Sequence, residues 1–435
     1  NLTRYPGALT AAQLTADPAQ ANSSFVTRDE RRRNRVGRIA ATLDRESGQN
    51  TISSAVWVEP KVLQRSERNR YRDFTRYHVG GNGVWSRTWQ AGGAIARTTI
   101  GGDEDWQDGA ILFYALGPGG SKSATVVANK REGANSAGIF AQQMFSWTRW
   151  SAQISARYDN LWYISQDNIT PLLNDTRHFS RTTPKGTVSY GLESHTIYAA
   201  LGGGVESPAF NEIDPPPPYD ALTSLNPFLD PMVSTTWELG MRGAESSRRG
   251  SIRYDAALYR IEVKHDIVPY GGGAYFFTAG RTRRQGAELA LEWQPAPALS
   301  LSGAVSVSSN EYLEYRNDLG TFDGNNVAGL PALLASAMAR YRFGAGVSAQ
   351  AGVSGNGRYF ADDANTASTI QFGVLDATLS WDRPIARGSL RAFVQGRNLL
   401  NKEYVSSVFI NGISGQYFEA GLPLNMNAGV SLRWQ

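Results

Sequence analysis

The residues near the end of the chain alternate strictly between apolar and polar types. From Leu424 to Trp434 every even position is apolar or small, and every odd position is polar or Gly. An alternation with period two describes a strand with one apolar and one polar face. A strand in a soluble protein typically has about 5–6 residues, whereas a strand that crosses an outer membrane needs about 9–11. The length of the segment and its terminal Trp therefore predict a membrane-crossing strand.

The same alternation recurs at 150–159, 287–293, 299–308 and 375–381. Three of these segments place a Trp at the end nearest a short turn, where an aromatic girdle would meet the lipid headgroups. A large soluble β-protein would also alternate, but its exposed positions are usually rich in Lys and Glu. Here the polar positions are mainly Ser, Asn, Gln, Arg and Glu. The pattern favours an all-β fold, a transmembrane antiparallel up-and-down β-barrel.

The composition is compatible with a barrel and with export. The 435 residues contain no Cys, which fits folding in an oxidising compartment. No run reaches the length of about 18 apolar residues that a transmembrane helix needs. Mean hydropathy is −0.36, and a barrel tolerates this value because alternation disperses its apolar residues. No signal peptide is visible, so we expect the exported protein to begin upstream of Asn1.

The basic residues are nearly all arginine. Of the 43 basic residues only six are Lys and the other 37 are Arg. Arg forms bidentate contacts with carboxylates and phosphates. The excess indicates either a path for an anionic ligand or a network of ion pairs inside a polar lumen, and the sequence leaves both interpretations open.

Short and long connections alternate along the chain, as the periplasmic turns and extracellular loops of outer-membrane barrels do. The short ones are predicted at 46–50, 90–93, 146–149, 193–195, 245–250, 294–298, 344–346 and 383–388. The long ones are predicted at 60–72, 104–134, 160–179, 206–232, 264–280, 309–328, 357–369 and 401–423. The run Pro215–Pro218 inside 206–232 favours a stiff polyproline II strut.

The connections divide the chain into about 17 predicted strands. They are 35–45, 50–60, 73–89, 94–103, 134–146, 149–160, 180–190, 195–205, 233–243, 249–264, 281–293, 298–309, 329–342, 346–357, 369–381, 388–400 and 423–434. With an odd number of strands the first and the last run the same way, so 1–33 would be an extracellular loop remnant, with a short helix at 9–21. Single-chain bacterial barrels have even strand numbers. We therefore expect 34–435 to be a barrel portion that lacks an N-terminal plug and about five strands of a probable 22.

Several phrases resemble TonB-dependent outer-membrane receptors. The resemblance spans about 135–435, and its phrases follow the order of the family. They are GIFAQQ at 138–143, WSAQISARYD at 150–159, GVESPAFNE at 204–212, WELGMRG at 237–243, GRTRRQGAELAL at 280–291 and GRNLLNKEY at 396–404. The chain departs from the family in ending with Gln435 after Trp434, and in lacking a plug and a TonB-contacting box.

A narrower resemblance is to the subfamily that includes the pyrroloquinoline quinone importer. It rests on DFTR at 73–76, AGRTRRQG at 279–286, ADDANT at 361–366, EYVSSV at 403–408 and GQYFE at 415–419.

These resemblances imply active, TonB-dependent import of a scarce small solute across the bacterial outer membrane, with an anionic cofactor such as pyrroloquinoline quinone as cargo. The alternative cargo is a ferric siderophore or ferric citrate. Alternatives of another class are a passive porin and a surface adhesin. The implied partners are a small molecule or metal chelate, the TonB complex through the missing N-terminal region, and outer-membrane lipid and lipopolysaccharide. We expect a monomer that binds no nucleic acid, holds no resident cofactor or metal and is not an enzyme.

An anionic aromatic cargo needs Arg side chains for its carboxylates and aromatic rings for stacking. Three extracellular clusters offer both, and for each the alternative is a loop packed on itself, with Arg bridging loop carboxylates or lipopolysaccharide phosphates. The candidate ligand-binding residues are Arg68, Arg72, Arg76 and His78 in the first cluster, Tyr275, Phe277, Arg281, Arg283 and Arg284 in the second, and Arg358, Tyr359 and Tyr417 in the third.

Overall fold

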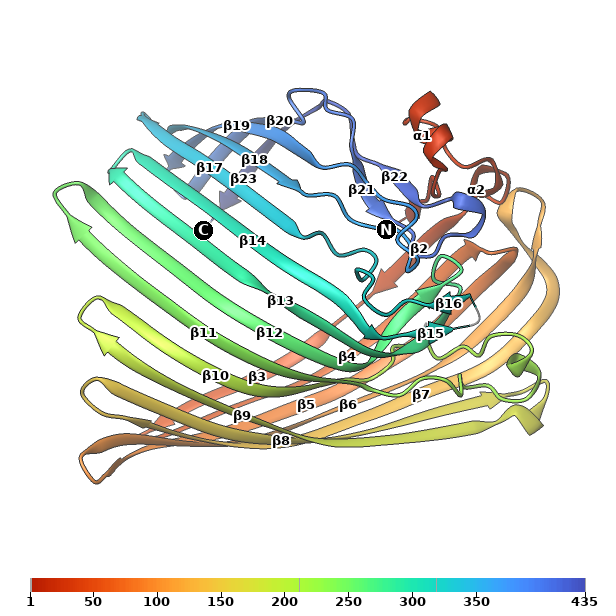
Figure 1. The fold of residues 1–435 in the computed structure, drawn as a ribbon, viewed down its shortest axis with the longest axis horizontal. Coiled ribbons are helices and arrows are strands. Elements are labelled where there is room, and N and C mark those ends of the chain that lie inside the picture. Colours follow the sequence, from red (N-terminus) through yellow and green to blue (C-terminus); the bar gives the residue numbers. More distant parts are fainter. Residues whose placement is uncertain (1, 211, 318, 435) are drawn as a thin grey trace.

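Among the described residues, 19 strands form one antiparallel sheet that curves into an elongated, ring-like wall (Figure 1), and four short strands form two further two-stranded sheets. The computed structural model describes residues 2–210, 212–317 and 319–434. Asn211 and Asp318, which fall in the predicted loops 206–232 and 309–328, lie outside the described residues. Among the described residues, no helix is long and apolar enough to cross a membrane.

The elements follow one another mainly as hairpins. The helices are α1 (Ala11–Ala16) and α2 (Ser23–Thr27), with 3-10 turns at Pro118–Gly120, Pro171–Leu173, Tyr219–Ala221 and Ile413–Gly415. The first strands are β1 (Leu2–Arg4), β2 (Arg31–Val36), β3 (Ile39–Ser47), β4 (Asn50–Glu67), β5 (Arg70–Ala91), β6 (Ala94–Gly117), β7 (Ser121–Ser146), β8 (Trp150–Asp167), β9 (Asp175–Leu192) and β10 (His195–Glu206). The next are β11 (Met232–Ser247), β12 (Gly250–Tyr270), β13 (Tyr275–Ala296), β14 (Leu299–Glu314), β15 (Arg316–Asn317), β16 (Gly320–Thr321), β17 (Leu333–Gly344), β18 (Val347–Asn356), β19 (Phe372–Ile385), β20 (Gly388–Arg397), β21 (Val405–Val408), β22 (Phe418–Ala420) and β23 (Asn425–Trp434).

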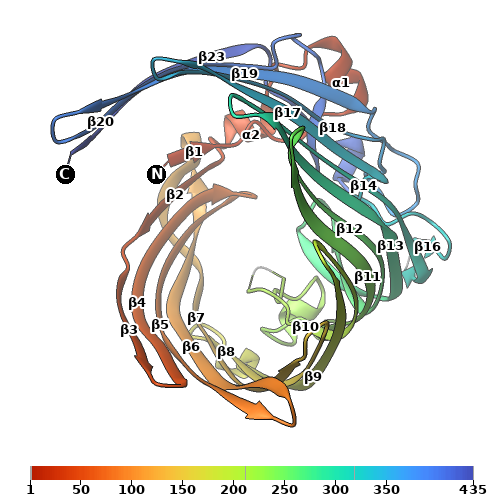
Figure 2. The ribbon, with the colours of Figure 1, turned by 90° about the vertical axis from the view of Figure 1, so that its left-hand side faces the viewer.

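The wall is open along one seam. Within the described chain, β3 pairs only with β4 and β23 pairs only with β20, so each presents an unpaired edge. Figure 2 shows the edge formed by β20 and β23 standing away from β2 and β3. The fold is thus an all-β antiparallel barrel wall, as predicted, but these residues alone do not close it.

The number of strands differs from the prediction at the start of the chain. The predicted first strand at 35–45 is split into β2 and β3, which pair with successive parts of β4. The short β1 adds one further strand because it pairs with β2.

Three predicted extracellular loops are wrong, because strands continue through them. The segment 60–72 is a hairpin of β4 and β5 that turns at Arg68 and Asn69, 104–134 is a hairpin of β6 and β7, and 264–280 is a hairpin of β12 and β13. Arg68 and Asn69 have φ of 51° and 60°, the left-handed conformation of a two-residue hairpin turn. None of these segments keeps the strict apolar–polar alternation of a membrane-crossing strand: 65–72 is rich in Arg, whereas 111–116 and 274–277 are continuous apolar runs. Paired strands outside the membrane do not need that alternation.

Exposed aromatic residues mark the two ends of the lipid-facing surface. Trp150 and Trp293 lie beside the short turns, whereas Tyr77, Trp106 and Trp162 lie further along their strands and are also exposed. Exposed Val, Ile and Leu side chains fill the outer face between the two sets. This arrangement is the apolar band with aromatic girdles of outer-membrane barrels, and it places the long connections on the extracellular side.

The N-terminal segment packs against a loop near the end of the chain. The helix α1 begins with a reciprocal cap, because the Thr10 side chain accepts a hydrogen bond from the Gln13 backbone and the Gln13 side chain accepts one from the Thr10 backbone. Leu9 accepts hydrogen bonds from the backbones of Tyr417 and Phe418 and donates one to Phe418. These bonds join the two sides of the open seam at its extracellular end.

The connection between β10 and β11 folds into the lumen. Its residues 207–210 and 212–231 are named the inner loop, and Figure 2 shows this segment in yellow-green inside the ring. Ile213, Leu225 and Leu229 are buried against Ala134 and Tyr163 of the inner wall. The run Pro215–Pro218 therefore lies within an inward-folded loop.

A single substitution tests which face meets lipid. Leu289 on β13 is 44% exposed and pairs with Ala256 and Val305, and the next residue, Ala290, faces the lumen. We expect Leu289→Arg to cost about 2–4 kcal/mol because a cation near the bilayer midplane is poorly solvated. Urea unfolding of the receptor in lipid vesicles measures this cost, with Ala290→Arg as the matched control. Equal destabilisation by both variants would contradict the assignment of faces.

Candidate functional site

The first predicted cluster becomes part of a larger basic surface on the lumen side. Cross-strand partners point to the same face of a sheet, and Arg32 of β2 pairs with Arg65 of β4, which pairs with Arg72 of β5. Lys61 pairs with Arg76 in the same way and on the same face. We call this surface, formed by Arg32, Lys61, Arg65, Arg72 and Arg76, the basic wall.

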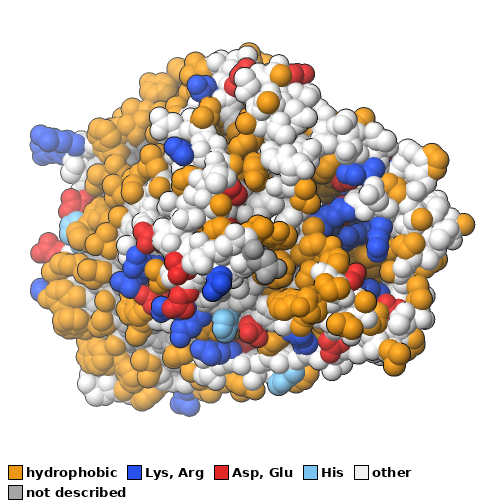
Figure 3. Space-filling model, turned by 45° about the vertical axis from the view of Figure 1, so that its right-hand side comes forward, with side chains coloured by type: hydrophobic (Ala, Val, Ile, Leu, Met, Phe, Trp, Pro, Cys, Tyr) orange, Lys and Arg blue, Asp and Glu red, His pale blue; other side chains and the backbone are white. Residues whose placement is uncertain are grey.

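The basic wall lies outside the membrane-spanning part of the barrel. Arg76 is the residue before Tyr77, an exposed aromatic residue of the extracellular girdle, and Arg72 lies further out on the same strand. Lys61 feels the positive charges of Arg32, Arg65 and Arg76 and the negative charge of Glu59, and Arg72 and Arg76 both act on Glu132. The five cations of the basic wall are thus linked electrostatically. In Figure 3, which turns the extracellular end forward, basic side chains gather in a group beside hydrophobic ones.

Positive charge exceeds negative charge within this cluster. Arg76 Nη2 lies 3.0 Å from Glu132 Oε2, and Arg65 Nη1 lies 3.4 Å from Glu67 Oε2. In the part of the chain that the structure describes, no carboxylate lies within ion-pair distance of Arg32, Lys61 or Arg72. Three unpaired cations on a concave surface attract anions, because a lined cleft focuses the electrostatic field.

Aromatic rings flank two of these cations. The Arg72 guanidinium lies 4.7 Å from the centre of the Phe113 ring, and that of Arg76 lies 4.1 Å from the centre of the Phe210 ring. Phe74 meets Phe113 edge to face, with ring centres 6.0 Å apart. The surface therefore combines cations with apolar ring faces, which is the chemistry needed by an anionic ligand with a planar or apolar body.

The other two residues of the first cluster lie on opposite sides of the basic wall, Arg68 on its extracellular side and His78 on its membrane side. Arg68 is in the β4–β5 turn and its Nη2 donates to the backbone oxygen of Gly273, at 2.7 Å. This bond joins the tips of the β4–β5 and β12–β13 hairpins. His78 faces the lumen below Arg76, and its buried Nε2 has no hydrogen-bond partner among the described residues.

Each arginine of the second cluster forms an ion pair with a carboxylate. Arg281 contacts Glu314, Arg283 Nη2 lies 2.6 Å from Glu311, and Arg284 Nη2 lies 2.6 Å from the buried Asp266. This geometry resembles the ion-pair network that the sequence offered as the alternative. Phe277 packs against Tyr270 and Phe228, and Tyr275 is paired with Tyr270 at the hairpin tip.

The third cluster belongs to packed loops. Tyr359 is buried, Arg358 lies over the Phe360 ring at 5.2 Å, and Tyr417 meets Phe418 edge to face. Arg68 joins the first and second clusters through Gly273, and Asn411 joins the second and third through its 2.8 Å bond to the Pro269 oxygen. The contacts among the described residues place none of Arg358, Tyr359 and Tyr417 beside the basic wall.

A buried carboxylate holds the extracellular loops together. Asp363 accepts hydrogen bonds from the Tyr312 hydroxyl at 2.6 Å and from Asn411 Nδ2 at 2.8 Å, and its backbone N–H donates to Asn411 Oδ1 at 3.0 Å. Tyr312, Asp363 and Asn411 are named the loop hub, because they come from three separate segments. Burial raises the pKa of Asp363, while the bonds from Tyr312 and Asn411 oppose that shift.

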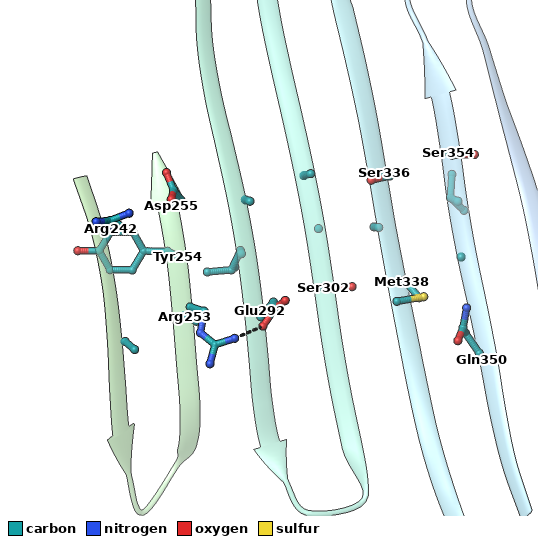
Figure 4. A pocket seen from close by; sticks show the side chains of 18 of the residues that line it. Arg242, Arg253, Tyr254, Asp255, Glu292, Ser302, Ser336, Met338, Gln350 and Ser354 are labelled. Carbon is teal, nitrogen blue, oxygen red and sulfur yellow. Dashed lines mark hydrogen bonds and ion pairs between the residues drawn. The ribbon is translucent and has the colours of Figure 1, made fainter. Parts of the chain in front are cut away.

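A second part of the inner wall is lined mainly by short side chains. A hollow of about 850 Å³ extends over β11 to β20 and includes Arg242, Asp255, Ser302 and Ser336. Figure 4 shows the short serines on neighbouring strands and the Arg253–Glu292 ion pair at one side. The hollow is broad and carries both signs of charge. Among the described residues no group of three or more His, Asp or Glu could hold a metal ion.

Sequence reasoning missed Arg32, Lys61 and Arg65. They come from β2 and β4, and only the tight turn at Arg68 and Asn69 brings β4 into register with β5. Recognising an Asn-containing two-residue turn would have revealed this hairpin, because its register follows from the turn.

The loop hub yields a prediction. A folded-state pKa above the ordinary value means that ionising Asp363 is unfavourable, so the stability of the hub falls as pH rises through that pKa. We expect Tyr312→Phe to cost about 1–3 kcal/mol at neutral pH, where the ionised carboxylate loses a donor. The cost should be smaller near pH 4, about the ordinary pKa of Asp, because protonated Asp363 needs that donor less. Hydrogen exchange of 357–369 measures the cost of Tyr312→Phe at each pH, with Tyr341→Phe, at an exposed position, as the control. The same cost at both pH values would contradict this role of Asp363.

Comparison with known proteins identifies the fold family. A family described as TonB dependent receptor-like, beta-barrel matches residues 3–399. The ferrioxamine receptor of Yersinia enterocolitica is 27% identical over 281 residues, which are 62% of this chain and 36% of that protein. The ferrichrome outer membrane transporter/phage receptor of Escherichia coli (strain K12) is 22% identical over 305 residues, which are 68% of this chain and 38% of that protein.

A solved structure agrees with these matches. The unliganded ferric citrate transporter FecA superposes with a TM-score of 0.78 at 17% identity, covering 99% of this chain and 65% of that one. The matched region thus spans less than half of the curated relatives named above. Since the family match covers most of the sequence, the chain belongs to the TonB-dependent receptor β-barrel family, whose members are outer-membrane proteins of Gram-negative bacteria.

Proposed function

We propose that this chain is the barrel part of a TonB-dependent importer of a ferric chelate that carries anionic groups. The observation that carries the proposal is the basic wall, where Arg32, Lys61 and Arg72 face the lumen with no carboxylate within ion-pair distance in the described residues. A passive pore would not need unpaired cations concentrated at its extracellular entrance, whereas a receptor gains affinity from them.

The relatives favour iron over the cofactor cargo. Those reported above are named for ferrioxamine, ferrichrome and ferric citrate, and none of the three is named for pyrroloquinoline quinone. Among these chelates, a citrate complex suits the basic wall best because carboxylates form charge-assisted hydrogen bonds with Arg and Lys. Pyrroloquinoline quinone also carries carboxylates, so it serves as the competing ligand in the test below.

We also propose which further parts complete the importer: additional strands, a plug domain and the TonB complex. The unpaired edges of β3 and β23 would take further strands, about five for a barrel of about 22. The hollow over β11 to β20, with short side chains and mixed charge, would face a plug domain inside the lumen. The TonB complex would act on that plug. Residues 1–33 would be the end of an extracellular loop, and the receptor would work as a monomer in lipid and lipopolysaccharide.

Replacing the unpaired cations tests the proposal. We expect Arg72→Gln and Lys61→Gln each to weaken binding of ferric citrate by about tenfold, because each removes one charge-assisted contact. Isothermal titration calorimetry on the full-length receptor measures the affinity. The matched control is Arg33→Gln, because Arg33 is adjacent to Arg32 in sequence but lies on the outer face of β2 and is exposed.

The same titrations separate the candidate functions. Tighter binding of pyrroloquinoline quinone than of ferric citrate, lost in the same variants, would replace the iron cargo by the cofactor. Uptake of radioactive iron that persists in cells without TonB would favour a passive pore. Equal affinities in Arg72→Gln, Lys61→Gln and Arg33→Gln would remove the basic wall from the binding site.

A further inference from the structure

The inner loop contacts two cations on the lumen side, Arg76 of the basic wall and Lys130 of β7. Phe210 covers the Arg76 guanidinium at 4.1 Å, and Asp214 Oδ1 lies 3.7 Å from Lys130 Nζ. Lys130 is on β7, and the neighbouring inward position on that strand is Glu132, the ion-pair partner of Arg76. A ring face and a carboxylate of the chain itself thus occupy positions where an anionic ligand would bind.

Both halves of the inner loop are held by apolar packing and a hydrogen bond to the wall, and the half before the proline run adds contacts with two cations. In the half before the proline run, Tyr163 donates a hydrogen bond to the Pro208 oxygen and meets the Phe210 ring edge to face at 5.6 Å. In the half after it, Leu225 and Leu229 are 2% exposed, and Asn226 Nδ2 donates to the Phe276 oxygen at 2.9 Å. Apolar burial does not respond to anions, whereas cation–π and ion-pair contacts do.

The stiff prolines separate the two halves. Each ring of Pro215–Pro218 fixes its φ angle, and Pro218, with φ of −87° and ψ of 5°, lies outside the polyproline II conformation that the sequence favoured. The residues 208–210 and 212–214 before them are named the arm. Within the arm, Pro208 and Ile213 are buried, and Phe210 packs against the same buried apolar group. The Asn226 backbone N–H donates a hydrogen bond to the Ile213 oxygen, at 2.7 Å. Displacing the arm therefore breaks two contacts with cations, the hydrogen bonds of Tyr163 to Pro208 and of Asn226 to Ile213, and the apolar packing of Pro208, Phe210 and Ile213. The burial of Leu225 and Leu229 against the wall does not depend on the arm's contacts with cations.

We propose that the arm is an internal competitor of the cargo, a latch that a polyanion opens by taking Arg76 and Lys130 from Phe210 and Asp214. This inference rests on the proposed binding surface and adds its regulation. A polyanion engages both cations and the unpaired cations of the basic wall together, so it gains more than the arm loses. A monovalent anion cannot bridge them, so it leaves the latch closed.

The latch has an energetic consequence for affinity. Each contact between the arm and a cation must be broken before cargo binds, so it lowers the apparent affinity of the receptor. Weakening the arm should therefore strengthen binding, which is the opposite of what a lid that contacts the cargo would do. The sign of the effect distinguishes these two roles.

Two variants of the arm test the proposal with pyrophosphate as the probe. We expect Phe210→Leu and Asp214→Asn each to raise the affinity of the full-length receptor for pyrophosphate by about threefold to tenfold, as expected from loss of a partly desolvated cation contact. The matched control is Tyr219→Leu, which removes an aromatic ring of the same loop that packs on Phe228 and not on the basic wall. Its affinity should equal that of the wild type.

Hydrogen exchange gives an independent readout that does not depend on affinity. Millimolar pyrophosphate should speed exchange at 208–210 and 212–214 and leave 225–229 unchanged, whereas chloride at equal ionic strength should change neither. Unchanged or slower exchange of the arm with pyrophosphate would overturn the latch, and so would unchanged or weaker binding by Phe210→Leu.

The outcomes also separate the latch from the proposed function. Arm release by pyrophosphate in a receptor that does not take up iron would retain the latch and reject the iron cargo. Iron uptake that depends on Arg72, without arm release, would retain the importer and reject the latch.

Discussion

Cross-strand register is the constraint on which the rest of this structure depends. Because side chains alternate along each strand, pairing Arg65 with Arg72 and Lys61 with Arg76 decides at once which residues face lipid and which face the lumen. A shift by one residue would turn Tyr77 inward and expose Arg76 to the membrane boundary. The same shift would turn every lumen-facing polar residue of the spanning part toward lipid, where a cation costs about 2–4 kcal/mol at the midplane and about 0–1 kcal/mol near the boundary. Register is therefore fixed mainly by the residues between the two girdles.

The arginine excess serves two purposes in different parts of the wall. On β13, Arg281, Arg283 and Arg284 are each matched by a carboxylate, so they hold neighbouring strands and loops together. On β2 and β5, Arg32 and Arg72 have no such partner among the described residues and leave a net positive surface. The exposed pair of Arg281 with Glu314 contributes about 0–1 kcal/mol, whereas Arg284 compensates the buried charge of Asp266. The paired arginines are thus occupied by carboxylates, and the unpaired ones remain available to a ligand.

The wall was predictable from the sequence and the site only in part. The alternation ending at Trp434 and the short turns are local patterns, so they predicted the strands, the orientation and the barrel class. The hairpins at Arg68 and at Gly271 were missed because paired strands outside the membrane do not alternate strictly: the first is rich in Arg and the second is flanked by apolar runs. The basic wall needs the register of three strands, and the inward fold of the inner loop depends on contacts such as Phe210 with Tyr163, which no local pattern encodes.

The most direct test of the account is a spin-label scan of β5 through residues 72–79 in the full-length receptor, embedded in lipid vesicles. The account predicts a period of two in accessibility near the girdle. Labels at 77 and 79 should collide mainly with oxygen dissolved in the lipid, and labels at 76 and 78 mainly with a water-soluble nickel chelate. Accessibility that varies smoothly along the strand, or alternates in the opposite phase, would contradict a lumen-facing basic wall.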